Sequence, residues 1–215
     1  MKKRIVLLGP PASGKGTQAE LISARYRLPI TSPGAILREE RRLGTSLGIE
    51  ADRLTSKGML MPDEIIVELV ERWLFQNGSA FIFDGFPRSL GQAESLERLL
   101  AVRGTPLEAV LALEADVEIL EARVAHRMMC SNCGRSLSVG LHIDSSSDPC
   151  PSCGGVLTRR SDDTPETLAV RLQEYAEKTE PLSDYYASRG LLHRIQSTAR
   201  PEVVFESIRA ILEGE

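Results

Sequence analysis

The chain has 215 residues, 42% of them hydrophobic, so it can bury a sizeable core as one domain with insertions or as two small domains. Its formal net charge of −4 gives no electrostatic reason to expect a nucleic-acid partner. No apolar run is long enough to span a membrane, and residues 1–4 lead directly into strand residues without a signal-peptide cleavage site. We therefore expect a cytoplasmic protein with no membrane partner.

A glycine-rich loop follows the first predicted strand. Residues 5–8 form an apolar run typical of a buried parallel strand, residues 9–14 can turn sharply at their glycines, and a helical pattern follows. Loop N–H groups and a helix N-terminus converge on an anion in such a segment, and the Lys15 ammonium adds a full charge. We therefore predict a phosphate-binding loop; the alternative is an ordinary strand-to-helix turn. The predicted residues are Gly9, Pro10, Pro11, Ala12, Ser13, Gly14, Lys15, Gly16 and Thr17.

The end of this loop carries a more specific pattern. Residues 14–19 read Gly-Lys-Gly-Thr-Gln-Ala, the form seen in nucleoside monophosphate kinases, and the stretch closely resembles the adenylate kinase family. The resemblance implies that residues 9–17 bind ATP and that Lys15 holds the β and γ phosphates of the donor. Ala12 stands where that family often has a third glycine, so a positive φ at Ala12 would strain the backbone.

Residues 32–62 are predicted to form a small helical lobe, because their apolar residues are too few for an independent core. By composition alone Arg38 would be a solvated residue of a charged helix. Residues 37–39 are similar, however, to a family segment whose arginine holds the AMP phosphate. Ser32 and Pro33 stand where the family has serine and a nucleotide-contacting threonine, and Pro33 lacks both the hydroxyl and the backbone N–H. Both are predicted to line the AMP site, with the choice of base left open.

A carboxylate ends the next predicted strand. Residues 80–83 are an apolar run, and Asp84 follows at the carboxyl edge of the predicted sheet, as in the strand that carries a magnesium-binding carboxylate in phosphate-loop proteins. A carboxylate there can hold Mg²⁺, most often through water. We predict a magnesium site formed by Thr17 and Asp84; the alternative for Asp84 is an ordinary turn residue.

Residues 84–88 read Asp-Gly-Phe-Pro-Arg, a highly specific signature of nucleoside monophosphate kinases, and Gln92 follows. The resemblance implies that Gly85 and Arg88 bind AMP, with Arg88 on its phosphate, and that Gln92 contacts the adenine edge. A glutamine amide suits that role because it offers both a donor and an acceptor, as the N6/N1 edge requires. It favours AMP over UMP or CMP. Without the neighbouring signature, Gln92 would be an exposed helix residue.

Four arginines further along the chain are predicted to gather around the transferred phosphoryl group. Arg123 and Arg127 are four residues apart on a predicted helix, so both would point from one face. The matching arginines of the family bind the adenine face and the phosphates of ATP. Residues 159–163 resemble the family's Arg-x-Asp-Asp motif, which makes Arg160 and the following Arg171 lid arginines that also contact AMP. Structural ion pairs are the alternative.

The acidic residues of that motif, Asp162 and Asp163, are expected to pair with arginines when the lid closes. Their alternative role is a favourable negative charge at the start of the helix predicted from residues 164–165.

All four cysteines fall in one short span, as two Cys-x-x-Cys pairs with sixteen residues between them. Two such pairs at this separation match a structural zinc site, and a pair of disulfides is the alternative. Four thiolates leave no open coordination position, so the zinc would fold the insert without taking part in chemistry. The predicted ligands are Cys130, Cys133, Cys150 and Cys153.

A pair of zinc knuckles also fits a different class of protein, one that binds nucleic acid or a nucleotide without kinase activity. Residues 139–148 carry no basic stripe and no aromatic residue for base stacking, which argues against nucleic acid. The insert is similar instead to the long lid of zinc-bearing bacterial adenylate kinases, and it occupies the same place in the chain.

Together these predictions describe an α/β fold of the P-loop NTPase type, with a five-stranded parallel sheet flanked by helices. The resemblance implies reversible phosphoryl transfer from Mg-ATP to AMP, giving two ADP, by a monomer; a UMP/CMP-type kinase is the alternative within the family. We expect one kinase domain, residues 1–215, with a core at 1–31, 63–126 and 164–215, a nucleoside monophosphate lobe at 32–62 and a zinc-ribbon-like lid at 127–163.

Overall fold

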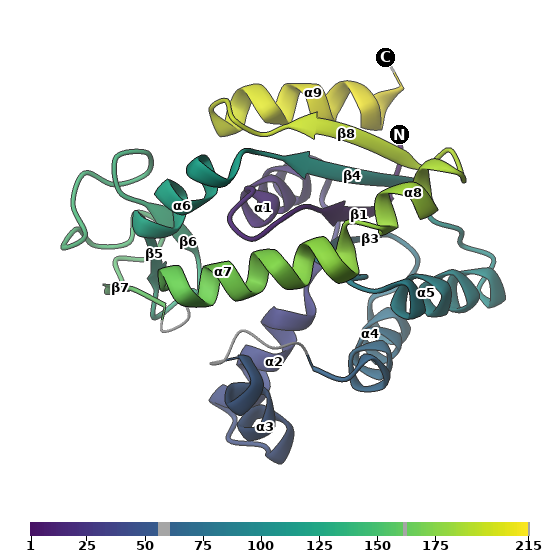
Figure 1. Cartoon of the computed structure of the whole chain (residues 1–215), viewed down its shortest axis with the longest axis horizontal. Coiled ribbons are helices and arrows are strands. Elements are labelled where there is room, and N and C mark those ends of the chain that lie inside the picture. Colours follow the sequence, from purple (N-terminus) through teal and green to yellow (C-terminus); the bar gives the residue numbers. More distant parts are fainter. Residues whose placement is uncertain (56–60, 161–162, 215) are drawn as a thin grey trace.

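The computed structural model describes residues 1–55, 61–160 and 163–214. Its main sheet has five parallel strands in the order β2-β3-β1-β4-β8 (Figure 1). The predicted α/β fold with a five-stranded parallel sheet is therefore confirmed. The strands are β1 (Arg4–Leu8), β2 (Ile30–Thr31), β3 (Phe81–Asp84), β4 (Ala109–Glu114) and β8 (Leu192–Gln196).

Helices connect these strands and cover the sheet. They are α1 (Lys15–Tyr26), α2 (Pro33–Arg42), α3 (Ser46–Thr55), α4 (Asp63–Asn77), α5 (Leu90–Val102), α6 (Val117–Ala125), α7 (Pro165–Glu174), the π-helical turn η1 (Tyr175–Thr179), α8 (Leu182–Ala187) and α9 (Pro201–Glu213). None of the helices in the described part of the chain combines the length and the apolar character that a membrane crossing requires.

Each face of the sheet packs against its own group of helices, because alternate strand residues point in opposite directions. Ile5 and Leu7 of β1 are buried in a cluster with apolar residues of α1 and α9. Val6 and Leu8 are buried on the other face, in a cluster with residues of α4, α5 and α8. The continuous apolar run of β1 is thus explained by burial on both faces, as in other parallel sheets.

The order of the strands fixes where a ligand can bind. β1 lies between β3 and β4 in the sheet. After β1 the chain continues to β2, on the β3 side of β1, whereas after β4 it continues to β8, on the opposite side. In open parallel sheets, ligands bind beyond the carboxyl ends of the strands at such a switch point. The loop after β1 and the residues after β3 both lie there.

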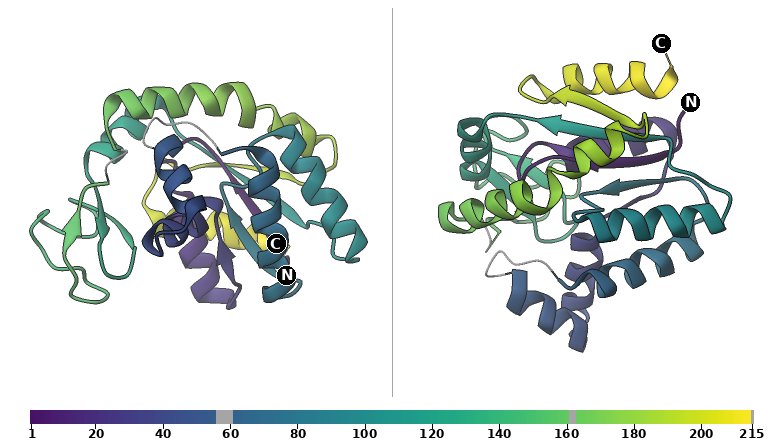
Figure 2. Two further views of the ribbon diagram at one scale, coloured as in Figure 1. Left: turned by 90° about the horizontal axis from the view of Figure 1, so that it is seen from below. Right: turned by 45° about the vertical axis from the view of Figure 1, so that its right-hand side comes forward.

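A second, antiparallel sheet lies beyond the carboxyl ends of the main strands (Figure 1). It consists of β5 (Arg127–Cys130), β6 (Ser136–Ser138) and β7 (Leu157–Thr158), in the order β6-β5-β7. Figure 2 shows this ribbon and the α2–α3 pair as separate projections from the core. The division into core, lobe and lid stays a prediction, and residues 56–60 of the lobe and 161–162 of the lid lie outside the described residues.

One local prediction about α6 is wrong. Arg127 does not lie on the helix with Arg123: α6 ends at Ala125, His126 follows as its C-cap, and Arg127 is the first residue of β5. Asp116 stands at the N-cap of α6, but its side chain makes no capping hydrogen bond.

Arg27 ends α1 in the left-handed region, with φ 55° and ψ 37°, and its N–H donates to the Ser23 carbonyl. For a non-glycine residue that conformation costs roughly 1 kcal/mol of conformational free energy. Because its side chain is exposed, Arg27→Gly is expected to raise the free energy of unfolding by about 1 kcal/mol in urea titrations. The control Ala24→Gly, at an exposed position inside the same helix, should lower it by about as much. Equal destabilisation by both variants would contradict this explanation.

Candidate functional site

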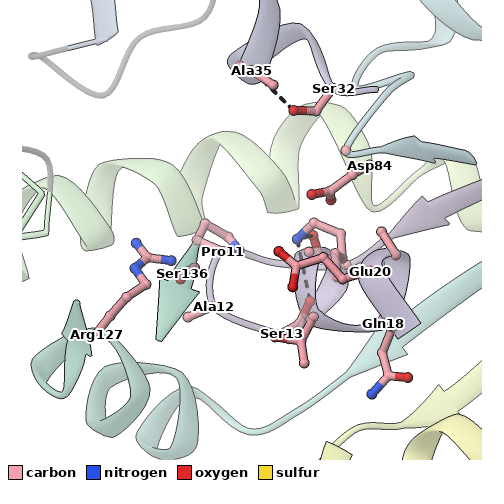
Figure 3. Close-up of a pocket in the computed structure, with 18 of the residues that line it drawn as sticks. Pro11, Ala12, Ser13, Gln18, Glu20, Ser32, Ala35, Asp84, Arg127 and Ser136 are labelled. Carbon is pink, nitrogen blue, oxygen red and sulfur yellow. Dashed lines mark hydrogen bonds between the residues drawn. The ribbon is translucent and has the colours of Figure 1, made fainter. Parts of the chain in front are cut away.

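A cleft of approximately 1290 Å³ opens at the carboxyl edge of the main sheet (Figure 3). It is lined by the loop after β1, the start of α1, the residues after β3, the α2 lobe, the β5–β7 ribbon and α7. Apart from Pro10, every residue predicted to contact a nucleotide or magnesium lines this cleft. The structure therefore brings into one cavity residues that lie more than 150 positions apart in the sequence.

The loop after β1 has the backbone geometry that a phosphate cradle needs. Gly9 has φ 145°, and a Cβ there would lie 2.5 Å from the Leu113 carbonyl oxygen, so another residue could not fit without a shift. Gly14 is the N-cap of α1 with φ 94°. Ala12 has φ 64°, the strained conformation considered from the sequence. The loop is thus held in place by close backbone packing.

Lys15 closes the loop with hydrogen bonds to its own backbone. The Nζ donates to the carbonyls of Gly9 and Pro10, both at 2.8 Å. Burial lowers the pKa of Lys15 to about 8, and the Asp84 carboxylate opposes that shift. Neighbouring cations lower the pKa further; they are Arg88, Arg171 and Arg127. The centre of the cleft therefore concentrates positive charge.

Asp84 and Arg88 extend this charged centre on the β3 side. Asp84 ends β3, and its Oδ2 lies 3.4 Å from the position that a Cβ on Gly16 would take, so the carboxylate faces the start of α1. In Figure 3, Asp84 and Arg127 lie on either side of the loop residues. The Nε of Arg88 donates to the Gly85 carbonyl at 2.8 Å, and burial lowers the pKa of the Arg88 guanidinium.

Arg123 reaches the cleft from α6 and is held by carbonyl groups. Its Nη1 donates to the Ala12 carbonyl at 3.3 Å, and its Nη2 donates to the Ser197 carbonyl. Ser197 is buried and is itself fixed, because its N–H and its hydroxyl both donate to the Glu114 carbonyl. Burial lowers the pKa of Arg123. A carbonyl-bound guanidinium keeps its full charge available for an anion.

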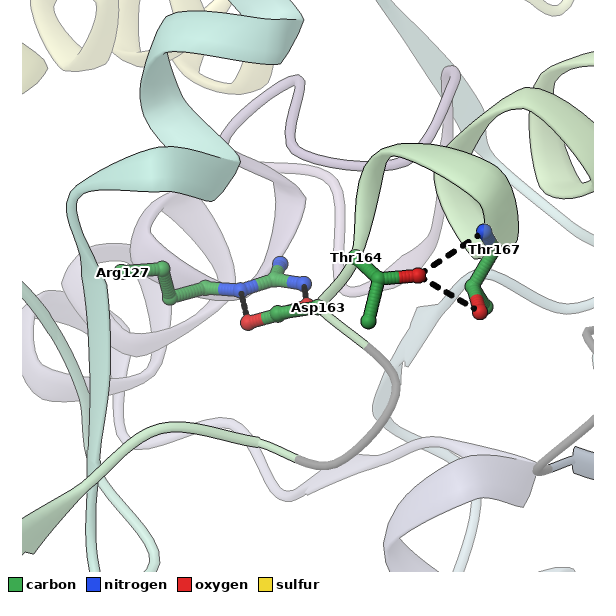
Figure 4. Close-up of polar contacts among 4 residues, drawn as sticks. All are labelled: Arg127, Asp163, Thr164 and Thr167. Carbon is green, nitrogen blue, oxygen red and sulfur yellow. Dashed lines mark hydrogen bonds and ion pairs between the residues drawn. The ribbon is translucent and has the colours of Figure 1, made fainter.

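Arg127 makes the ion pair that was the alternative for these arginines. Its Nε donates to Asp163 Oδ2 at 2.7 Å and its Nη2 to Asp163 Oδ1, a two-point contact seen in Figure 4. The side chains are 16% and 2% exposed, so the pair is shielded from solvent. The predicted pairing of an arginine with Asp163 is confirmed, while Asp162 lies outside the described residues. Arg127 is also a lining residue of the cleft.

Arg160 and Arg171 are the last two of the predicted arginines. Both line the cleft, and Arg171 is carried by α7. That helix begins where the sequence predicted, since Thr164 is its N-cap, accepts from the Thr167 N–H at 3.2 Å and is followed by Pro165 (Figure 4). The cap and the proline fix the start of α7, the helix that carries Arg171.

The lobe side of the cleft begins at Ser32. Its Oγ accepts from the Ala35 N–H at 3.0 Å, which makes Ser32 the N-cap of α2 (Figure 3). Pro33 is the first helical residue, a position where the missing N–H is not needed. The local structure thus accounts for Pro33 without reference to a ligand. Arg38, one turn further along α2, lines the cleft.

Gln92 is buried at 2% exposure, so the exposed alternative is wrong. Its Oε1 accepts from the Arg88 N–H at 2.8 Å, and its Nε2 donates to Asp63 Oδ1 at 2.6 Å. An amide has two lone pairs and two N–H groups, so one acceptor position and one N–H stay available. Gln92 can therefore still form a paired contact with a base.

The four cysteines meet in the ribbon. Their Sγ atoms all lie within 4.8 Å of one another, with 3.5 Å between Cys130 and Cys153 and 3.8 Å between Cys133 and Cys150. Thiolates at about 2.3 Å from one tetrahedral ion are separated by about 3.8 Å, so the cluster is compatible with zinc. All four are free cysteines, and the disulfide alternative is not what the structure has.

Comparison with known proteins decides the family. The adenylate kinase family model matches residues 7–191. The chain is 40% identical to an adenylate kinase of Thermodesulfovibrio yellowstonii, covering 98% of this chain and 99% of that protein. It is 42% identical to one of Salinispora tropica, covering 97% and 96% of the two chains, and 39% identical to one of Archaeoglobus fulgidus, covering 97% of each. The chain belongs to the adenylate kinase family.

Membership of the adenylate kinase family confirms the resemblance inferred from the loop and from residues 84–88. The structure adds residues that the sequence did not single out. Asp63 and Ser197 hold Gln92 and Arg123, and Glu174 lines the cleft and acts on the pKa of Arg88 in the opposite direction to burial. Glu20 of α1 forms an ion pair with Arg135 of the ribbon at 3.3 Å. Each acts on a residue that is distant from it in the sequence.

The lowered pKa of Lys15 has a consequence for stability. Between pH 8 and about 10.5 the unfolded chain keeps a proton on Lys15 that the folded chain has released, so stability due to this residue rises with pH in that window. The unfolding free energy of the wild type, minus that of Lys15→Met, should be constant below pH 8 and rise above it. Lys15→Arg, charged throughout, should match Lys15→Met in its pH profile. Parallel profiles for all three proteins in urea titrations would contradict the shift.

Proposed function

We propose that this chain catalyses the reversible transfer of the γ-phosphoryl group of Mg-ATP to AMP, giving two ADP. The observation that carries the proposal is one cleft lined by the phosphate loop, by Arg88 and Gln92, and by arginines of α6, the ribbon and α7. Transfer between two phosphates needs alignment and charge compensation more than covalent chemistry, and this cleft offers both.

The donor nucleotide is proposed to bind the loop after β1. The N–H groups of residues 9–17 and the Lys15 ammonium would contact the β and γ phosphates. Arg123 would lie against the adenine, and Arg127 would contact the phosphates. Mg²⁺, held by the Thr17 hydroxyl and the Asp84 carboxylate, would compensate the charge of the phosphate oxygens when bound.

The acceptor nucleotide is proposed to bind between α2 and the residues after β3. Arg38 and Arg88 would hold the phosphate of AMP, and Gly85 would allow its close approach. Ser32 and Pro33 would line the pocket of the nucleoside. The free donor and acceptor of the Gln92 amide match the N1 and N6 edge of adenine.

The transferred group would then lie between Lys15 and the arginines. Charge that spreads over its equatorial oxygens in the transition state would be stabilised by guanidinium groups placed before the reaction. The proposed catalytic residues are Lys15, Arg88, Arg123, Arg160 and Arg171. Several of them belong to the predicted lid, so they would assemble fully only when both nucleotides are bound, which limits transfer to water.

We also propose that the cysteine cluster holds one structural Zn²⁺. The four thiolates fit a tetrahedral ion, and the ribbon's buried apolar residues are few: Met128, Leu137, Ile143 and Leu157 beside Cys130 and Cys150. We further propose a cytoplasmic monomer whose partners are ATP, AMP and ADP, without nucleic acid or membrane. Size-exclusion chromatography with light scattering would test the monomer.

The acceptor is tested with Mg-ATP and each of AMP, UMP, CMP and GMP in a coupled assay of ADP formation. We expect kcat/KM for AMP to exceed that for every other acceptor by at least about tenfold, because one well-placed hydrogen-bond pair contributes about 1–3 kcal/mol. As a negative control, Lys15→Met should lower kcat/KM for AMP by about 100-fold or more. Preference for UMP or CMP would assign the chain to the other branch of the family. If none of the four acceptors is turned over, the result would favour a nucleotide-binding protein without kinase activity.

Removal of the metal is expected to weaken the fold more than the chemistry. A chelator, or Cys130→Ser, should lower the midpoint of thermal unfolding by about 5 °C or more, corresponding to ~2 kcal/mol for a chain of this size. Turnover at 20 °C should fall by less than about threefold, because a closed four-thiolate site offers no position to substrate. The chelator should have no further effect on Cys130→Ser. Complete loss of turnover with an unchanged melting curve would contradict a structural role.

A further inference from the structure

The amide of Gln92 is held in one orientation by two different kinds of neighbour. On one side Oε1 accepts from the Arg88 N–H at 2.8 Å, and on the other Nε2 donates to Asp63 Oδ1 at 2.6 Å. A carboxylate oxygen accepts hydrogen bonds and a backbone N–H donates them, so the two contacts agree on the orientation. A reversed amide would place its oxygen against the Asp63 carboxylate and its NH₂ group against the Arg88 N–H.

Both neighbours are themselves fixed. Asp63, the first residue of α4, also accepts a hydrogen bond from the Ser89 hydroxyl through its other oxygen. Ser89 is the N-cap of α5 and accepts from the Gln92 N–H at 3.2 Å. The Arg88 carbonyl accepts from the Thr179 hydroxyl at 2.8 Å, which holds the same residue whose N–H contacts Gln92. With Gln92 only 2% exposed, these contacts are shielded from competing water.

The orientation decides which base edge can pair with the glutamine. The free lone pair on Oε1 and the free N–H on Nε2 complement a base with an amino donor beside a ring-nitrogen acceptor. A 6-oxo purine has a carbonyl and an N1–H in the same places, so it requires the reversed amide. A site that hydrogen-bonds one pattern rejects the other because buried polar groups are left unpaired.

We propose that Asp63 is a specificity-determining positioning residue: by accepting from Gln92 Nε2, it fixes the amide so that the site takes 6-amino purine nucleotides and rejects 6-oxo purine nucleotides. Asp63 acts through Gln92 and does not itself contact the base. The inference rests on the proposed function, since it assumes that Gln92 lies at the acceptor base.

The test compares AMP with IMP, which has the same size and the opposite hydrogen-bond pattern at the six-membered ring edge. Asp63→Asn keeps the shape of the side chain, but its amide can donate as well as accept, so it removes the penalty that the Asp63 carboxylate imposes on the reversed glutamine; the opposition of the Arg88 N–H remains. We expect the ratio of kcat/KM for AMP to that for IMP to fall by about tenfold or more, mainly through a gain with IMP, since a hydrogen bond to a charged group contributes this much. Asp63→Ala removes the acceptor altogether and should lower the ratio in the same direction.

Ser89→Ala is the matched control. It removes the other hydrogen bond to Asp63 and the cap of α5, but leaves the Asp63–Gln92 contact, so it should lower the melting temperature without changing the AMP/IMP ratio. Folding of each variant is checked by circular dichroism, and the ratio is read from whichever Asp63 variant folds. An unchanged ratio in a folded Asp63 variant would overturn the proposal, as would an equal change in Ser89→Ala. A wild type that uses IMP as well as AMP would also overturn it, whereas a wild type inactive with AMP would refute the proposed function itself.

Discussion

Positive charge held away from water, before any anion is bound, is the constraint on which this structure depends. Burial lowers the pKa of Lys15 and of the Arg88 and Arg123 guanidinium groups, which means that the folded chain holds these cations at a cost. Asp84 offsets part of this cost at Lys15, and Asp163 forms a shielded ion pair with Arg127. Phosphates would supply the remaining negative charge, so substrate binding and closure of the cleft would stabilise the fold together.

Holding these cations in place requires a second set of residues behind them. Ser197 is fixed by the Glu114 carbonyl at the end of β4 and presents its own carbonyl to Arg123. Thr179, in the π-helical turn after α7, donates to the Arg88 carbonyl. Such turns are frequent at functional sites. The sheet sets the position of the cleft, and these contacts set the direction of the groups within it.

The sequence predicted most of what depends on neighbours along the chain. The phosphate loop, the strands at residues 5–8 and 80–83 and the start of α7 follow from local patterns of glycine, apolar residues and caps. The sequence-based prediction was wrong for Arg123 and Arg127. Their spacing of four residues suggested one helix face, but α6 ends before His126 and Arg127 begins β5 of the ribbon. Asp63 carried no signal at all, since its contact with Gln92 spans 29 residues.

The ribbon shows how stability and chemistry can be separated within one insertion. Its apolar cluster is too small to fold alone by hydrophobic burial, so the crosslink of four cysteines through one proposed metal ion is the main restraint on its shape. Arg127 lies at its base, paired with Asp163, and Arg135 contacts Glu20 of α1 beside the cysteines. Loosening the cysteine end would therefore leave the guanidinium at the base in place at low temperature, because the Arg127–Asp163 pair is buried and independent of the metal. On heating, a ribbon without this restraint would open locally before the core unfolds, since it has few buried apolar residues of its own, and the pair at its base would then be exposed as well.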